Sequence, residues 1–127
     1  MRAILDRVLS STDIQTTPSR GPLPLDDALK ILRSSRRRYA VDVLPLDDEI
    51  DIGELATEIA EIEVGGNPTS KERKRVYVSL YQTHIPKLTK SGVLEAIDHN
   101  TYRAGPAFEQ VAGILECVRE RAEEARK

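Results

Sequence analysis

Two runs of basic residues, separated by a run of acids, are the part of this sequence that bears most directly on chemistry. Residues 30–40 carry five bases and no acid, residues 41–63 carry nine acids and no base, and residues 64–92 carry six bases against one acid. Basic side chains that share a surface bind phosphate groups. A fold that brings the two basic runs together would therefore suit a nucleic acid, whereas separate runs would be ordinary solvated helix faces.

The second basic run belongs to a helix that we predict over residues 70–91. At 100° per residue, the inward face of this helix holds Tyr77, Tyr81, His84, Ile85 and Leu88. On the opposite face, lysine and arginine suit phosphates, glutamine suits an adenine edge, and serine or threonine suits either; the alternative is an ordinary polar helix face. Taken from this face, from the first basic run and from a predicted hairpin, the candidate DNA-binding residues are Arg36, Arg37, Lys71, Lys74, Arg75, Ser79, Gln82, Thr83, Lys87 and Arg103.

Both basic runs place their charges at the start of a predicted helix. Lys71, Lys74 and Arg75 open one helix, and the arginines at 36–38 open another. Positive charge at a helix N-terminus opposes the helix dipole, so local helix stability does not account for these residues. A phosphate partner would account for them. For Lys71, Lys74 and Arg75 the alternative is neutralisation by Glu72 or by the acidic helix at residues 54–63, and one of the arginines at 36–38 could instead pair with Asp42.

Apolar spacing, capping residues and helix breakers predict the elements that hold these side chains. Thr69 and Glu72 have capping-box spacing, and Gly92 ends the helix that they begin. Pro86 lacks the N–H that would bond to the carbonyl of Gln82, so we expect a kink or a break near residues 82–86. We predict helices at residues 25–33, 36–44, 53–62, 70–91 and 106–126, a short edge strand at 50–52, and hairpin strands at 93–97 and 101–104.

The order of these elements predicts a mainly α fold with a small β-hairpin (α+β), namely a winged helix-turn-helix with an added C-terminal dimerisation helix. In that fold the helix before the hairpin is the recognition helix, here about residues 70–91, and the hairpin at 93–104 is the wing. We expect a flexible tail at residues 1–22, where Ser, Thr, Pro and Gly are frequent. A winged-helix domain at 23–105 and a partner helix at 106–127 follow.

Three segments of the chain resemble an uncharacterised family of haloarchaeal winged helix-turn-helix domains. They are Arg36–Tyr39, Ile52–Ala56 and the stretch from Arg75 to Val93, of which the last is the most specific. The resemblance covers about residues 25–105. It implies a winged helix and DNA binding, and it carries no established activity.

An apolar stripe with coiled-coil spacing runs along the predicted helix at 106–126. Because this helix follows a complete core, we predict that the stripe pairs with the same helix of a second subunit. The alternative is that the stripe docks on the first helix of its own chain. Cys117 lies beside the stripe, where we expect a buried small side chain. The candidate dimer-interface residues are Phe108, Val111, Leu115, Val118 and Ala122.

The chain of 127 residues fits one compact domain, and it carries no catalytic or metal-ligand motif. Its single cysteine excludes an internal disulfide, its two histidines lie in different elements, and no apolar run approaches the ~20 residues of a membrane span. We therefore expect a cytoplasmic protein that is not an enzyme, without metal, cofactor or membrane contact. The sequence does not identify a small-molecule effector.

Two functions fit these observations. The first is a sequence-specific DNA-binding transcriptional regulator that acts as a homodimer on double-stranded DNA. The second is a winged-helix protein–protein interaction module without DNA binding, suggested by the acidic run at residues 41–63. The folded charge distribution separates the two, because DNA binding requires the bases at 36–38 and 71–75 to share a face with the hairpin.

Overall fold

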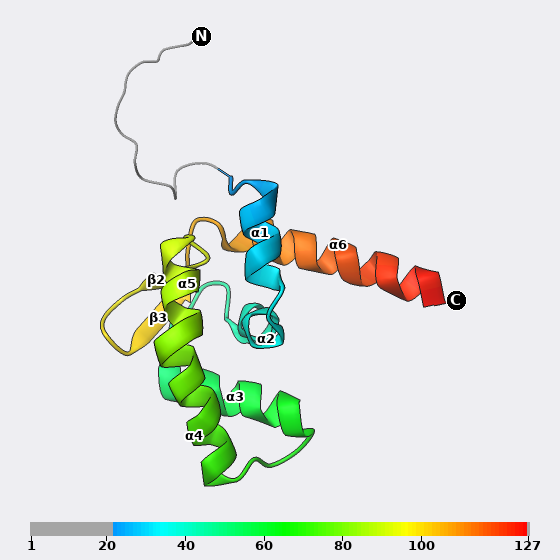
Figure 1. Cartoon of the computed structure of the whole chain (residues 1–127). Helices are drawn as coiled ribbons and strands as arrows, with labels where there is room; N and C mark the ends of the chain where they lie inside the picture. Colours follow the sequence, from blue (N-terminus) through cyan, green and yellow to red (C-terminus); the bar gives the residue numbers. More distant parts are fainter. Residues whose placement is uncertain (1–21, 127) are drawn as a thin grey trace, which may run out of the picture.

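The computed structural model describes residues 22–126, so nearly all of the predicted tail at residues 1–22 lies outside the described part of the chain. The protein is mainly helical with a small three-stranded antiparallel sheet, as the α+β prediction requires (Figure 1). The elements are α1 (Leu25–Leu32), α2 (Ser35–Val43), β1 (Ile50–Asp51), α3 (Ile52–Val64), α4 (Ser70–Ser79), the π-helical turn η3 (Leu80–His84), α5 (Ile85–Lys90), β2 (Leu94–Ala96), β3 (Thr101–Ala104) and α6 (Phe108–Arg126).

One hydrophobic core joins the helices to the sheet. Asp51 fixes the start of α3, because its carboxylate accepts hydrogen bonds from the backbone N–H groups of Gly53 (2.7 Å) and Glu54 (3.4 Å). The buried face of α3 then packs against α4, which leaves the polar face of α4 toward solvent. The largest fully buried side chains include Ile52, Leu55, Ile59, Leu80, Leu88 and Val111.

The elements α4, η3 and α5 follow one another without a break over residues 70–90, and we call them together the long helix. In η3 the N–H of Ile85 bonds to the carbonyl of Leu80, and the turn ends at His84, two residues before Pro86. The disturbance expected near Pro86 is therefore confirmed. Its form is a π-helical turn, which adds one residue to the helix where proline removes an N–H donor.

The extra residue of η3 corrects the predicted inward face. Ile85 is buried as expected, but Leu80, the first residue of the turn, and Val76 before it are buried instead of the two tyrosines. Tyr77 is 37% exposed and Tyr81 is 57% exposed. At a uniform 100° per residue, Tyr81 and Tyr77 lie on the same face of the helix as Ile85. A π-turn inserts one residue, so Leu80 and Val76 occupy that face instead. The prediction for both tyrosines was wrong for this reason.

The sheet has the strand order β1-β3-β2, with all neighbours antiparallel. Ile50 lies opposite Tyr102, which confirms the short edge strand expected at residues 50–52. Gly92 adopts a φ of 84° at the end of α5, a left-handed conformation that suits glycine, and turns the chain into β2. The hairpin β2–β3 lies on one flank of the long helix, and α1 and α2 lie on the other (Figure 1).

The first half of α6 belongs to the core, which corrects the predicted dimer interface. Phe108, Val111 and Leu115 are only 4%, 0% and 5% exposed, and α6 packs against α1 and α2 of its own chain. The side chain of Gln110 also exchanges two hydrogen bonds with the backbone of Leu23 (2.7 and 3.0 Å). The core is therefore not complete without this helix, and these three apolar residues are unavailable to a second subunit.

The second half of α6, residues 116–126, is exposed throughout and extends away from the rest of the molecule (Figure 1). Its base is held by an ion pair in which Arg119 donates two hydrogen bonds to Asp42 (2.8 and 2.9 Å). Cys117 is exposed, contrary to the expectation of burial. Of the predicted dimer residues, Val118 and Ala122 remain accessible, and Val118 is 54% exposed.

Candidate nucleic-acid interface

The long helix presents basic residues near both of its ends. They are Lys71, Lys74 and Arg75 near the start and Lys87 and Lys90 near the end, all exposed. Within residues 22–126, no carboxylate lies within ion-pair distance of any of the five. Glu72 is occupied otherwise, because its carboxylate accepts a hydrogen bond from the N–H of Thr69 (2.8 Å) in the predicted capping box. The long helix therefore keeps its positive charge.

The fold brings the first basic run beside the second. Arg36, at the start of α2, lines a shallow hollow together with Lys71, Lys74 and Arg75 of α4. Lys30 and Arg33, at the end of α1, line a separate cavity together with Lys87 and Lys90 of α5. The bases of both runs thus follow the flank of the long helix that faces α1 and α2.

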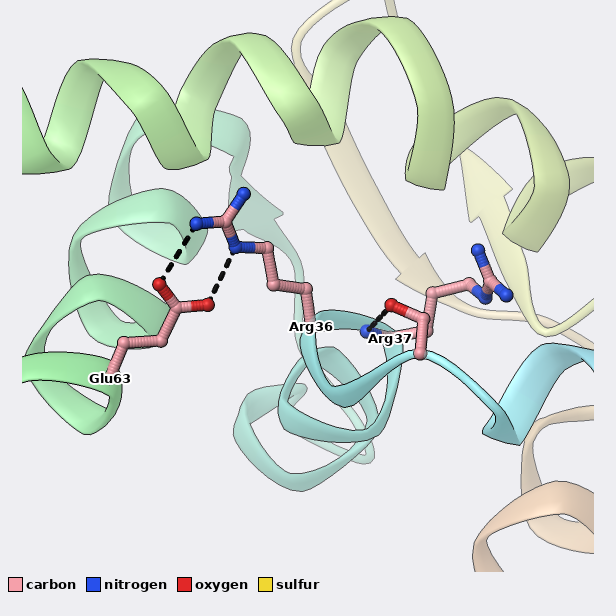
Figure 2. Close-up of polar contacts among 4 residues, drawn as sticks. Arg36, Arg37 and Glu63 are labelled. Atoms are coloured by element: carbon pink, nitrogen blue, oxygen red, sulfur yellow. Dashed lines mark hydrogen bonds and ion pairs between the residues drawn. The ribbon is translucent and has the colours of Figure 1, made fainter.

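Arg36 shares this flank, but its charge is partly compensated. Its guanidinium donates two hydrogen bonds to the carboxylate of Glu63, at 2.6 Å and 3.0 Å (Figure 2). This hydrogen bonding, together with the negative charge of Glu63, raises the pKa of Arg36. Glu63 belongs to the acidic run. Asp42, the partner that the sequence suggested for one of these arginines, pairs with Arg119 instead.

Arg37 is not a DNA-contacting residue, which corrects the prediction. Its side chain leaves α2 away from Glu63 (Figure 2) and is only 6% exposed. The guanidinium donates to the carbonyls of Ile31 (2.8 Å) and Lys30 (2.9 Å) and lies 3.1 Å from Nδ1 of His84. Burial and the neighbouring charge of Arg33 lower the pKa of Arg37. Arg37 therefore joins α1, α2 and the long helix.

The middle of the long helix combines the predicted polar residues with apolar ones that the sequence did not indicate. Gln82 and Thr83 are exposed and Ser79 is half-buried, while Tyr81 and the neighbouring Val78 (39%) are exposed as well. Burial and the nearby phenols of Tyr81 and Tyr77 raise the pKa of Tyr102 in β3. The tyrosines of the long helix thus lie on its hairpin flank. The one sequence signal for their exposure was Pro86, whose π-turn shifts the register.

The hairpin adds little positive charge. Arg103 forms an ion pair with Glu95 across the two strands (2.9 Å), and both side chains are about half exposed. Asp98 lies in the connecting loop, where a hydrogen bond from the N–H of Asn100 (2.8 Å) lowers its pKa. Strand β3, which carries Arg103, lies across the long helix from α1 and α2, which carry the bases of the first run (Figure 1).

Metal and membrane sites receive no support from the described part of the chain. Between residues 22 and 126, no three His, Cys, Asp or Glu side chains gather as metal ligands. The helices of the same range lack the combination of length and apolar composition that crossing a membrane requires.

A comparison with protein families finds one match. A family model described as Domain of unknown function (DUF7344) matches residues 29–102, from α1 to β3, which is more than half of the chain. The matched range contains the long helix and β2, and it ends before α6. No protein of curated function and no solved structure matches the chain.

Proposed function

This chain belongs to the family described as Domain of unknown function (DUF7344), and we propose that it is a cytoplasmic, non-enzymatic, DNA-binding regulator of transcription. It acts as a homodimer on double-stranded DNA, with the long helix in the major groove and the hairpin at residues 93–104 as the wing. The observation that carries the proposal is the set of exposed bases on the long helix that no carboxylate of residues 22–126 neutralises.

The order of the elements supports a winged helix. The helix α2 is followed by a short strand, then α3, the long helix and a two-stranded hairpin, and β3 lies between β1 and β2. In a winged helix the second and third helices form the helix-turn-helix and the hairpin is the wing. In this reading α3 is the supporting helix, and the long helix is the recognition helix.

The positions along the long helix divide the contacts between phosphates and bases. Lys71, Lys74 and Arg75 at one end and Lys87 at the other suit the phosphates that flank a major groove. The exposed Gln82 and Thr83 lie between them, where an amide and a hydroxyl suit base edges. Affinity would therefore come from the ends of the helix and sequence preference from its middle.

The competing function is a winged-helix interaction module without DNA binding. It is favoured by the exposed Tyr77, Val78 and Tyr81 on the long helix, since aromatic residues are common in the cores of protein interfaces. The hairpin favours it as well. Its charges are balanced, and it lies across the long helix from α1 and α2, so the bases of the first run do not share the face with the hairpin that DNA binding requires. The exposed bases at both ends of the same helix argue against it. They place charged side chains on both sides of the apolar residues, whereas the core of a protein interface is depleted of charge.

A salt-titrated binding assay tests the proposal. We expect labelled random and genomic duplexes to bind the full chain with an affinity that falls as salt rises, since phosphate contacts release counterions. Arg75→Ala and Lys87→Ala should each weaken binding to every sequence by about tenfold and reduce the salt slope by about one. Gln82→Ala should instead change the preference among sequences.

Arg126→Ala, at the far end of α6, is the matched control for loss of one positive charge, and it should leave binding unchanged. If Arg75→Ala and Lys87→Ala bind DNA as the unchanged protein does, the proposed function fails and the interaction module takes its place. The resemblance to haloarchaeal domains argues for extending the titration to high salt.

The proposed dimer rests on the exposed half of α6. Val118 and Ala122 are separated by one helical turn on the exposed segment 116–126, and a second copy of the same segment would cover them. We expect Val118→Glu to sediment as a folded monomer, because it places two like charges in a desolvated seam.

Cys117→Glu adds the same charge beside the stripe and should remain dimeric. Leu115→Glu should destabilise folding by about 4 kcal/mol, because its site lies in the chain's own core. A Val118→Glu protein that sediments with the mass of the unchanged one would contradict the dimer.

A further inference from the structure

A cavity of about 490 Å³ lies between α1 and the C-terminal end of the long helix. Its volume falls within the range of small-molecule sites, roughly 300–1,000 Å³. Five of the residues that line it are basic and one, Asp27, is acidic; Leu23, Ile31 and Ser91 complete the lining. The basic residues are Lys30, Arg33, Arg37, Lys87 and Lys90.

Arg37 gives the cavity a buried positive charge without a carboxylate partner. A guanidinium has five N–H donors. Three of those of Arg37 are directed to the carbonyls of Ile31 and Lys30 and to Nδ1 of His84, which leaves two N–H groups without a partner among residues 22–126. A buried charge is costly unless an opposite charge or enough hydrogen bonds compensate it. This arginine therefore lacks a negatively charged partner.

The neighbours of Arg37 add positive charge and supply no negative charge to compensate it. His84 accepts from Arg37 and must be neutral at Nδ1 to do so, and burial together with Arg37, Arg36 and Lys87 lowers the pKa of His84. Asp27 forms no ion pair with any base of the described chain. The four exposed bases of the lining also repel one another, so an anion between them would relieve repulsion and compensate Arg37.

We propose that this cavity binds a phosphate group, held by Lys30, Arg33, Lys87 and Lys90 at its rim and by the free N–H groups of Arg37 at its base. The phosphate belongs either to a small phosphorylated molecule or to a DNA backbone. The inference rests on the cavity and not on the proposed function. Because Lys87 also belongs to the candidate DNA interface, a small ligand bound here would compete with the DNA phosphates for it.

The first experiment measures binding of inorganic phosphate and pyrophosphate to the full chain by calorimetry, at constant ionic strength set with chloride. We expect the double variant K30Q/K90Q to bind about tenfold more weakly, because two charge-assisted contacts are lost. The matched double variant R121Q/R126Q removes the same charge from the exposed end of α6 and should bind as the unchanged protein does. An equal loss in both double variants would show non-specific attraction and would overturn the proposal.

The second experiment uses the two histidines of the chain as reporters. Bound phosphate would reduce the positive field on His84, so its imidazole, followed by NMR, should titrate at higher pH when pyrophosphate is present. His99 lies in the hairpin loop, and it serves as an internal control whose titration should not change. Identical titration of His84 with and without pyrophosphate, at concentrations where calorimetry detects binding, would place the anion elsewhere and overturn the site.

A duplex arm distinguishes the two sources of the phosphate. If a 20-base-pair duplex displaces bound pyrophosphate from the unchanged protein but not from K30Q/K90Q, the site binds backbone phosphate. Retention of pyrophosphate in the DNA complex would assign it to a small ligand. If K30Q/K90Q binds pyrophosphate and DNA as tightly as the unchanged protein, the bases are merely solvated and the proposal fails, whatever the outcome for the proposed function.

Discussion

The arginines at 36–38 of α2 and the bases at 71–75 of α4 occupy similar places, within the first two turns of a helix, where positive charge opposes the dipole. Their surroundings differ. Arg37 is buried and bound to carbonyls of α1, and Arg38 donates to the carbonyl of Leu32 (2.6 Å), whereas Lys71 and Arg75 are exposed and have no acidic partner within residues 22–126. The same residue types thus have a structural role in one place and an available charge in the other.

The reason lies in how the preceding helix ends in each case. α1 ends without a glycine, and its last carbonyls accept hydrogen bonds from the arginines of α2. The carbonyl of Lys30 accepts one from the N–H of Arg33 as well (3.3 Å). α3 ends at Gly65, whose φ of 73° turns the chain away, and the N–H groups of Gly65 and Gly66 both bond to the carbonyl of Glu61. Lys71, Lys74 and Arg75 therefore have no helix end to cap and remain exposed, whereas Arg73 is half-buried and donates to the carbonyl of Pro68 (3.0 Å).

The largest expected effect comes from replacing Arg37, the buried member of the comparison between Arg37 and Arg75. Arg37→Ala should lower the free energy of unfolding by about 3 kcal/mol, because it leaves buried carbonyls and His84 without their donor. Arg75→Ala should change it by no more than about 0.5 kcal/mol. Urea unfolding of both variants measures the difference, and equal stabilities would show that burial does not separate the two basic runs.

A smaller effect comes from pH. The pKa of folded His84 is lowered below its ordinary 6.5, first by burial and then by Arg37, Arg36 and Lys87, against an opposing contribution from Glu63. The unfolded chain therefore binds a proton near pH 6.5 that the folded chain binds only at lower pH, so stability should fall as pH drops from 6.5 to the folded pKa. Below that pKa the loss is complete.

Unfolding measured between pH 8 and pH 5 tests this. His84→Gln retains an acceptor for Arg37 but does not titrate, so it should remove this part of the pH dependence. His99→Gln should leave it in place. If the free energy of unfolding of His84→Gln depends on pH as that of the unchanged protein does, protonation of His84 does not cause the pH dependence.

The smallest expected effect comes from removing the ion-pair partner of Arg36, which leaves its charge free to contact DNA. Glu63→Gln frees Arg36 from its ion pair and should cost less than about 1 kcal/mol, since exposed ion pairs contribute little. Because Arg36 lies beside Lys71, Lys74 and Arg75, DNA affinity should rise about threefold at low salt. Glu61→Gln, at an exposed position on the same helix, is the control. An equal gain in DNA affinity for this variant would show that the change in net charge, and not the release of Arg36, causes the effect.

Local rules predicted most of the elements. The capping residues Asp51 and Thr69, the helix-ending Gly92 and the apolar spacing of α3 each act within a few residues, so the sequence alone places those boundaries close to where the structure has them. The predicted kink near Pro86 was also local. Its consequence was not, because a single added residue in η3 changes which side chains of α4 face the core.

The candidate site was predictable as a set of charges but not as a set of roles. The sequence by itself determined that two basic runs flank an acidic one, and that the second run lies on a polar helix face. Only the tertiary structure decided that Arg37 is buried, that Glu63 compensates Arg36, and that the first half of α6 completes the core. The physical reason is that a side chain's charge is set by its type, whereas its partners and its burial depend on elements far away in the sequence that folding brings into contact.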